Sequence, residues 1–141
     1  MATGTAGDVG QRFHTNQVHY LIKRISYEDF PGTANAAVTV GVLPPRSVVF
    51  YGATWIVTAF DDTNGDDLDI GVSGSDDDLF ASAVDLNTGD IYTTFDDLAD
   101  ANRWSTAART VTANFTTAPS DDGTTGECIV YLEYFVAPSI S

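Results

Sequence analysis

The chain has 141 residues and a mass of 15.0 kDa, which is enough for one domain with its own core and too little for two ordinary domains. Its formal net charge is −14, from 17 Asp, 3 Glu, 5 Arg and 1 Lys, which argues against nucleic acid or an anionic membrane as a partner. The content of 43% hydrophobic and 11% aromatic residues argues against a disordered chain.

The single cysteine, Cys128, cannot close an intrachain disulfide, and its apolar surroundings predict a buried thiol. No segment approaches the roughly 18 consecutive apolar residues of a membrane span. The first residues also lack a basic region followed by an apolar stretch. We therefore expect a protein that is made and folds in a cytosol.

Residues 1–17 are rich in glycine and small polar side chains without periodicity, so we expect an extended N-terminal arm. Residues 18–141 are expected to form a single β-sandwich domain. The first two strands are predicted at 18–27 and 36–42, and a rigid corner at Pro44-Pro45 follows them.

The segment 48–60 is the longest predicted strand, and it is apolar on both alternations. Gly52 suggests a bulge or a bend within it. The pattern places two sets of side chains on opposite sides: Val48, Phe50, Ile56 and Phe60 on one, and Val49, Tyr51, Trp55 and Val57 on the other. A strand that is apolar on both sides should be covered twice, by a second sheet and by a further partner.

Further strands are predicted at 68–72, 91–95, 109–116 and 128–136. Ser75 and the three aspartates after it predict the start of a short helix over the sequence LFASAV, and residues 96–107 fit either a helical turn or a loop. In the last strand, Val130, Leu132, Tyr134 and Val136 are expected to point inward. About seven or eight strands with regular turns predict an all-β fold, an antiparallel β-sandwich or jelly roll.

The acidic loop after the long strand is the most plausible metal site, because calcium prefers clustered carboxylate and amide oxygens. Asp62, Asn64 and Asp66 fit alternate ligand positions of a calcium loop. However, Asp67 stands where a glycine is required, and Ser73 stands where a glutamate closes the loop. The departures favour a solvated hairpin loop, with calcium as the alternative.

No other pattern indicates chemistry. His14 and His19 would need further ligands to hold zinc, and the sequence contains no nucleophile elbow, phosphate loop or recognisable catalytic triad. We predict no catalytic residue and no cofactor, and therefore a protein that is not an enzyme. Tyr20, Tyr51 and Trp55 suit a sugar-binding surface, although a core or a subunit interface is the favoured interpretation.

Several segments together resemble small proteins encoded in the head-gene clusters of tailed phages, described as capsid decoration, cement or head-fibre-type proteins. The resembling segments cover most of the chain beyond Gln17: DFPGT at 29–33, VTVGVLPPRS at 38–47, VTAFD at 57–61, DDLDIG at 66–71, LFASAVDL at 79–86 and VYLEYF at 130–135.

The resemblance implies a homotrimeric virion protein, assembled in the host cytoplasm, on the exterior of the major capsid protein shell at three-fold or quasi-three-fold positions. Such a protein stabilises the shell by bridging capsomers. Under this interpretation the expected capsid contacts are Gly10, Arg12, Phe13, His14, Lys23, Arg24 and Arg46. The expected subunit interface contains Phe50, Tyr51 and Trp55. The alternatives are a carbohydrate-binding adhesion module and a structural protein of the tail or neck.

Overall fold

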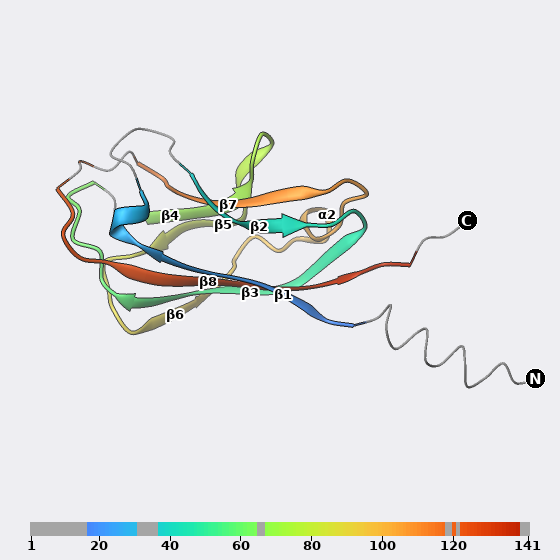
Figure 1. The fold of residues 1–141 in the computed structure, drawn as a ribbon, viewed down its shortest axis with the longest axis horizontal. Coiled ribbons are helices and arrows are strands. Elements are labelled where there is room, and N and C mark those ends of the chain that lie inside the picture. The colour runs from blue at the N-terminus through green and yellow to red at the C-terminus, as the bar shows by residue number, and fades with distance from the viewer. Residues whose placement is uncertain (1–16, 31–36, 65–66, 118–119, 121, 139–141) are drawn as a thin grey trace, which may run out of the picture.

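The computed structural model describes residues 17–30, 37–64, 67–117, 120 and 122–138, which form two packed layers of antiparallel strands (Figure 1). Among these residues, no helix is both long and apolar enough to cross a membrane. The elements are β1 (His19–Ser26), the 3₁₀ turn η1 (Tyr27–Asp29), β2 (Val38–Leu43), β3 (Ser47–Thr58), β4 (Asp67–Val72), β5 (Asp76–Asp85), β6 (Ile91–Thr94), α2 (Asp100–Arg103), β7 (Arg109–Phe115) and β8 (Glu127–Val136).

The strands are ordered β1-β8-β3-β6 in one sheet and β2-β7-β4-β5 in the other. Strand β1 pairs with β8, β2 with β7, β3 with β6, and β4 with β5, all antiparallel. The chain therefore resembles one long β-hairpin whose tip lies between β4 and β5. This hairpin is rolled up so that successive strand pairs belong alternately to the two sheets. This is the jelly-roll arrangement, and it confirms the predicted all-β class.

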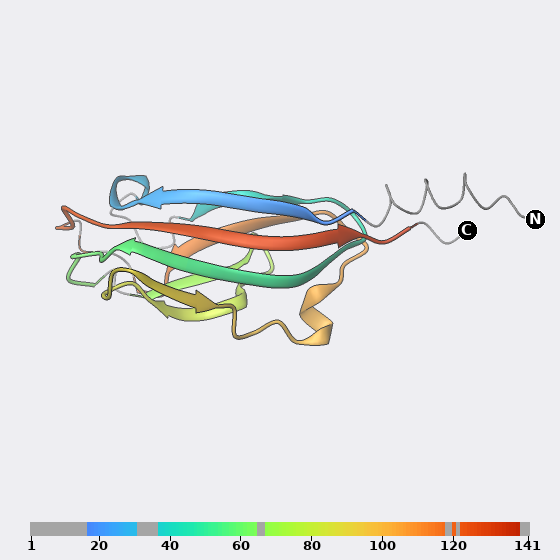
Figure 2. The same cartoon turned by 90° about the horizontal axis from the view of Figure 1, so that it is seen from below.

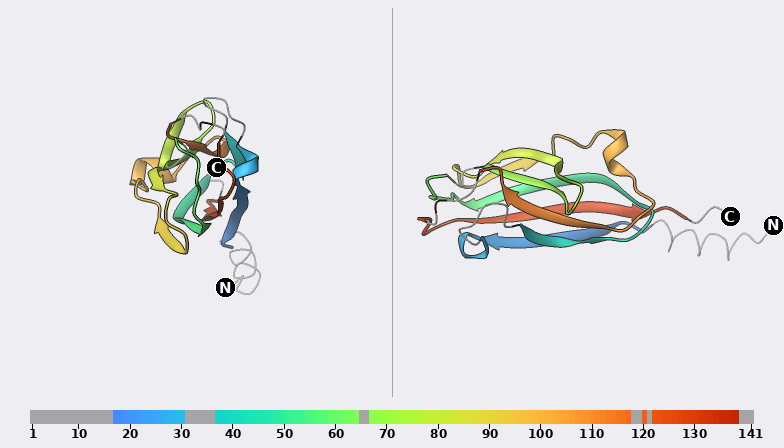
Figure 3. Two further views of the ribbon diagram at one scale, coloured as in Figure 1. Left: turned by 90° about the vertical axis from the view of Figure 1, so that its left-hand side faces the viewer. Right: turned by 90° about the horizontal axis from the view of Figure 1, so that it is seen from above.

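The core lies between the two sheets, whose layers are seen end-on in the left panel of Figure 3. Alternate residues of the central strands point into it. Val111, Ala113 and Phe115 of β7 face Cys128, Val130 and Leu132 of β8 across the interior, and all six are buried. Burial raises the pKa of the Cys128 thiol to about 12, so it is a packed apolar side chain rather than a reactive one.

A β-bulge in β3 explains why that strand is apolar on both alternations. The pairing with β8 shifts between Val49 and Tyr51, so Phe50 is the inserted residue, two positions before the glycine that the sequence suggested. Before the bulge, Ser47 and Val49 are buried; after it, Thr54 and Ile56 are buried. The predicted grouping of Val48 and Phe50 with Ile56, and of Val49 with Tyr51 and Trp55, is therefore wrong, because the bulge reverses the inward side midway.

The predicted helix after Ser75 is also wrong, because the segment forms strand β5. Phe80, Ala81 and Val84 are buried, and β5 pairs with β4 through two irregular positions. One irregularity includes Ala83, whose φ is 51°, and whose amide donates to the buried Asp69 carboxylate at 2.9 Å. Tertiary pairing thus overrides the helix-start signal, and the short helix is α2 within the ambiguous segment 96–107.

Candidate interaction face

The four strands of the sheet β1-β8-β3-β6 lie side by side in Figure 2, and the outer side of this sheet carries exposed large apolar side chains from β1, β3 and β6 and half-buried ones from β8. The exposed fraction is 61% for Tyr20, 64% for Ile22, 44% for Trp55 and 57% for Tyr92. We call this surface the aromatic face; its residues are Tyr20, Ile22, Phe50, Tyr51, Trp55, Tyr92, Ile129 and Tyr131. Exposed apolar groups gathered on one surface usually mark a site of interaction.

Strand register brings these residues together from distant parts of the sequence. Ile129 of β8 lies opposite Arg24 of β1 on one side and opposite Trp55 of β3 on the other, and Trp55 in turn lies opposite Tyr92 of β6. Directly opposed side chains in antiparallel strands are close enough to contact one another. The face is therefore a product of the jelly-roll pairing, since no two neighbouring members of this row are close in sequence.

Tyr131 lies in the middle of the aromatic face and contacts two other rings. Its ring stacks on Tyr20 with centroids 5.6 Å apart and meets Tyr51 edge-on at 6.3 Å. Its hydroxyl donates to the Glu133 carboxylate, and desolvation together with that carboxylate raises the pKa of Tyr131 to about 12. The three rings therefore form a preorganised, uncharged cluster that loses little conformational freedom on contact with a partner.

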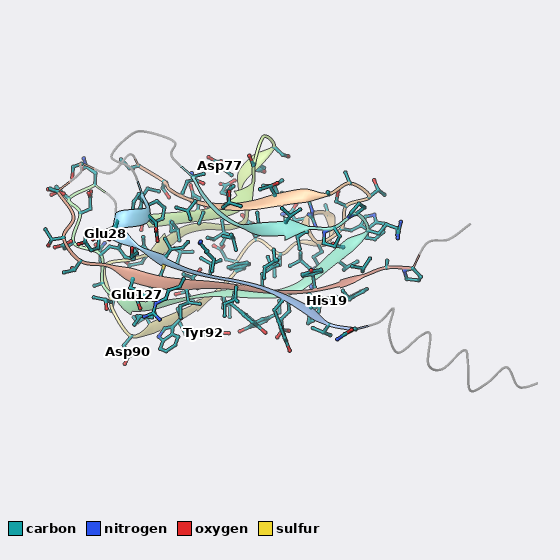
Figure 4. All side chains as sticks on the ribbon, in the orientation of Figure 1. His19, Glu28, Asp77, Asp90, Tyr92 and Glu127 are labelled. Carbon is teal, nitrogen blue, oxygen red and sulfur yellow. The ribbon has the colours of Figure 1, made fainter. Side chains whose placement is uncertain are left out.

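The aromatic face carries little net charge although the whole chain carries −14. None of the 17 aspartates lies in β1, β3, β6 or β8. Of the two glutamates there, Glu127 forms an ion pair with Arg24, and Glu133 accepts from Tyr131. Figure 4 shows Glu127 and Tyr92 on this side of the molecule and Asp77 on the opposite side. Bringing another acidic surface close therefore costs less electrostatic energy at this sheet than at the aspartate-rich strands β4 and β5.

The structure places Phe50, Tyr51 and Trp55 on this face, because the bulge and not simple alternation sets their side, and their role in a subunit interface stays a prediction. Phe50 also lies 6.1 Å from Phe135 of β8, between ring centroids. Sequence reasoning missed Ile22, Tyr92, Ile129 and Tyr131. The available signal was the second alternation of the last strand, where Ile129, Tyr131 and Phe135 are apolar as well.

The basic residues expected to contact a capsid do not form one patch. Arg24 lies opposite Ile129, whereas Arg46 donates to the Ala137 carbonyl at 3.1 Å beyond the other end of β8. Eight residue steps separate Ile129 from Ala137, or roughly 27 Å at about 3.4 Å per residue. Lys23, next to Arg24, is half-buried at the sheet edge. The other expected contacts, Gly10, Arg12, Phe13 and His14, lie outside the described residues.

The acidic loop after β3 uses its carboxylates as hydrogen-bond acceptors for the β7–β8 loop. Asp61 accepts from the backbone amides of Thr124 and Thr125 and from the Thr124 hydroxyl at 2.6–2.9 Å. Asp62 accepts from Ser120 and from the amide of Asn64. These hydrogen bonds, the Thr124 hydroxyl first, lower the pKa of Asp61 to about 2. Of the three predicted calcium ligands, Asp66 lies outside the described residues, so that site stays a prediction.

Among known proteins, the chain is similar to solved structures but to no protein family and no curated sequence. No protein-family model matches the chain, and no curated protein matches its sequence. A chain from the capsid of Ralstonia phage GP4 is similar, with a TM-score of 0.63 and 19% identity over 87% of this chain and 86% of that one.

Two further phage capsids contain similar chains. For the acidic stable capsid of Helicobacter pylori bacteriophage KHP30, the TM-score is 0.58 with 16% identity over 89% of this chain and 96% of that one. For the capsid asymmetric unit of cyanophage Pam1, the TM-score is 0.59 with 18% identity over 87% of each chain. At these identities the likeness establishes the fold, a jelly roll also found in chains of three phage capsid structures.

Proposed function

We propose that this chain is a non-enzymatic structural protein of a phage particle, which binds the exterior of the capsid and bridges neighbouring capsomers. The observation that carries the proposal is the aromatic face, an aspartate-free apolar surface on a strongly acidic jelly roll. Its fold is shared with chains from phage capsids, and several sequence segments resemble decoration and cement proteins.

In this proposal the protein acts as a homotrimer whose seams include Phe50, Tyr51 and Trp55. Each copy offers an apolar surface that a second copy can cover, and association would remove exposed aromatic area from water. The trimeric state rests on the resemblance rather than on the geometry of one chain. Three linked copies bind a shell with many weak contacts more tightly than one copy does, so capsomer bridging requires no chemistry.

The proposed shell contacts are the arm at 1–17 and the basic residues Lys23, Arg24 and Arg46, with the major capsid protein as the partner. The decisive experiment is to locate the protein in purified particles by density and by its stoichiometry to the major capsid protein. Density outside the shell at three-fold positions is the expected result. Density restricted to the tail or neck would contradict the proposal, as would binding that is unchanged after deletion of residues 1–16 and mutation of all three basic residues.

A second candidate function, carbohydrate binding, is favoured by the same row of exposed rings, because aromatic side chains stack on sugar rings. Tyr20, Trp55 and Tyr92 stand on a sheet surface, and none of them lines either of two hollows formed by described residues, one near Asn114 and one near Ala83. Most small-ligand sites are concave, which makes this the weaker proposal. A glycan array with the intact chain and a Trp55→Ala variant tests it: binding that Trp55→Ala abolishes would favour adhesion.

A further inference from the structure

Strand β6 is a free edge of the sheet β1-β8-β3-β6, because it pairs only with β3 (Figure 2). The Phe95 amide donates to the Gly52 carbonyl at 2.9 Å, and hydrogen-bonded and non-hydrogen-bonded pairs alternate along antiparallel strands. The backbone groups of Thr93 therefore face β3, whereas those of Tyr92 and Thr94 face away from it. These outward amides and carbonyls have no hydrogen-bond partner among the described residues, so the edge can pair with a further strand.

The other three sheet edges carry features that discourage strand addition. Strand β1 contains Lys23 and Arg24, β2 has a bulge between Thr39 and Gly41, and β5 is irregular at two positions and begins with three aspartates. Charged side chains and bulges protect edge strands from pairing. Strand β6 (Ile91–Thr94) has neither, and its four uncharged residues favour extended backbone. It is therefore the edge best suited to a partner strand.

The two sides of this edge differ in chemistry. On the outer side, Tyr92 belongs to the aromatic face and lies opposite Trp55. On the inner side, Thr93 lines a hollow of about 240 Å³ together with Asp85 and Asp96. The other residues that line this hollow are uncharged: Ser82, Ala83, Val84 and Thr94. A matching strand therefore has an apolar side chain on one side and a basic side chain on the other.

The segment 9–15 of the N-terminal arm, VGQRFHT, meets this requirement. Neighbouring residues of an extended strand point to opposite sides, so Phe13 can join the aromatic face while Arg12 points toward the acidic hollow. Residues 1–16 contain one aspartate and one arginine, which leaves the whole net charge of −14 on residues 17–141. The arm therefore approaches the acidic domain of another copy without the repulsion that separates two domains.

Strand register favours the arm of a second copy over the chain's own arm. Strand β1 begins at His19, which lies opposite Tyr134 of β8, and Tyr134 lies opposite Val49 of β3. Strand β6 instead pairs with residues 53–56, farther along β3 from that end of the sheet. The chain's own arm would have to turn back across the aromatic face to reach β6. Sixteen extended residues span about 50 Å, which is enough to reach a neighbouring copy.

We propose that the segment 9–15 of one copy adds a strand to the edge of β6 in a second copy, with Phe13 on the side of the aromatic face and Arg12 on the side of the hollow. The two outward residues of β6 offer up to four backbone hydrogen bonds to the added strand. This exchange of arms rests on the proposed homotrimer and names the contact that joins its copies. Residues 1–8 and the basic side chains of β1 stay available for the shell.

The first test is a cross-link between two co-expressed variants with C-terminal tags of different size. One carries Thr94→Cys, and the other carries a cysteine at one of positions 9 to 15. Oxidation should give covalent dimers at alternate arm positions, because only every second side chain lies on the side of Thr94. Cys128 is buried and does not compete, and Val42→Cys, exposed on the other sheet, should give no such dimers.

The second test exchanges charges in the intact chain. Arg12→Asp should weaken association at least about tenfold in sedimentation, and Asp85→Arg in the same chain should restore it. Asp76→Arg, at the exposed start of β5, makes the same change of charge on the other sheet and should not restore association.

Three outcomes would overturn the exchange of arms and leave the proposed function intact. They are a trimer without cross-links between copies, unchanged association after deletion of residues 1–16, and equal restoration by Asp76→Arg and Asp85→Arg. Cross-links found only within one chain would also overturn it, since they would assign β6 to the chain's own arm. Cross-linked trimers that fail to bind particles would instead contradict the proposed function alone.

Discussion

At the scale of single residues, the aspartates of this chain differ in their surroundings: some accept hydrogen bonds from another loop, and others face further carboxylates. Asp61 joins the β3–β4 loop to the β7–β8 loop through three hydrogen bonds, whereas Asp76 to Asp78 repel one another. A composition that looks like a uniform acidic surface therefore contains carboxylates that stabilise the ionised fold and carboxylates that oppose it.

The first prediction concerns Asp61 and pH. Its pKa is about 2 in the folded chain against 3.8 for the free side chain, so the ionised form stabilises the fold above about pH 4. This contribution is lost as the pH falls from about 4 to about 2. Asp61→Asn should be less stable than the parent at pH 6, and the difference should shrink toward pH 2. Urea unfolding from pH 2 to 6 measures this, with Asp97→Asn in an exposed loop as the control. If the stability difference between Asp61→Asn and the parent did not change with pH, the shape of the side chain and not its charge would explain the effect.

The second prediction concerns two glycines that allow close packing. A Cβ on Gly71 would meet backbone atoms of Asp76 and Asp77, and a Cβ on Gly52 would meet the Phe95 ring, in both cases at 2.2 Å. The ring can move, but the backbone can move only if the hairpin tip lifts. Gly71→Ala should therefore destabilise the chain by about 1–3 kcal/mol, more than Gly52→Ala, in chemical denaturation. An equal or smaller cost for Gly71→Ala would show that the hairpin tip is not held over the sheet.

At the scale of elements, the sequence pattern predicts seven of the eight strands, most of them from a regular apolar face. The two errors share a physical cause. The bulge at Phe50 reverses the inward side of β3, and the irregular pairing near Ala83 lets β5 follow β4 despite a helix-start signal. Both irregularities arise from pairing with another strand, β8 for β3 and β4 for β5. The sequence of a strand does not by itself reveal how its partner pairs with it. The aromatic face could be predicted only in part for the same reason, since pairing of β1, β3 and β8 creates it.

The third prediction concerns how α2 is attached to the sheet. Arg109 at the start of β7 is only 9% exposed, and its guanidinium donates to the carbonyls of Asn102 and Arg103 at 2.7 and 3.1 Å. The guanidinium carbon also lies 5.3 Å from the centroid of the Phe80 ring. Lysine has the charge but not the planar fork, so Arg109→Lys should cost about 1–3 kcal/mol of unfolding free energy. Arg46→Lys, at an exposed turn, should cost little, and equal costs would contradict this account.

At the scale of the whole molecule, charge is segregated between the two sheets. Strands β4 and β5 and the loops carry most of the aspartates, whereas the aromatic face carries none. Two copies with charge −14 each repel one another in most orientations. A contact that covers the aromatic face keeps the aspartates of β4 and β5 away from the partner and buries apolar area. Charge distribution and hydrophobic exposure therefore favour the same contact surface, although they are independent properties of the sequence.

The fourth prediction tests this surface with two matched substitutions. Ile22 on the aromatic face and Val42 on the other sheet are both β-branched strand residues, with exposed fractions of 64% and 55%. Ile22→Asp and Val42→Asp remove similar apolar area and add the same charge. We expect the parent to sediment as a trimer at micromolar concentration, Ile22→Asp to associate at least about tenfold more weakly, and Val42→Asp to remain a trimer.

The melting temperatures of the two variants, measured below the concentration of association, should be equal, because both side chains face away from the core. Equal loss of association would mean that added charge alone separates the copies, and the aromatic face would have no special role. Loss of association in Val42→Asp alone would place the subunit interface on the sheet β2-β7-β4-β5. The aromatic face would then be free to bind the capsid or a sugar. A parent that is monomeric while Ile22→Asp fails to bind particles would instead make this face the shell contact, because the same apolar surface can be covered by only one partner at a time.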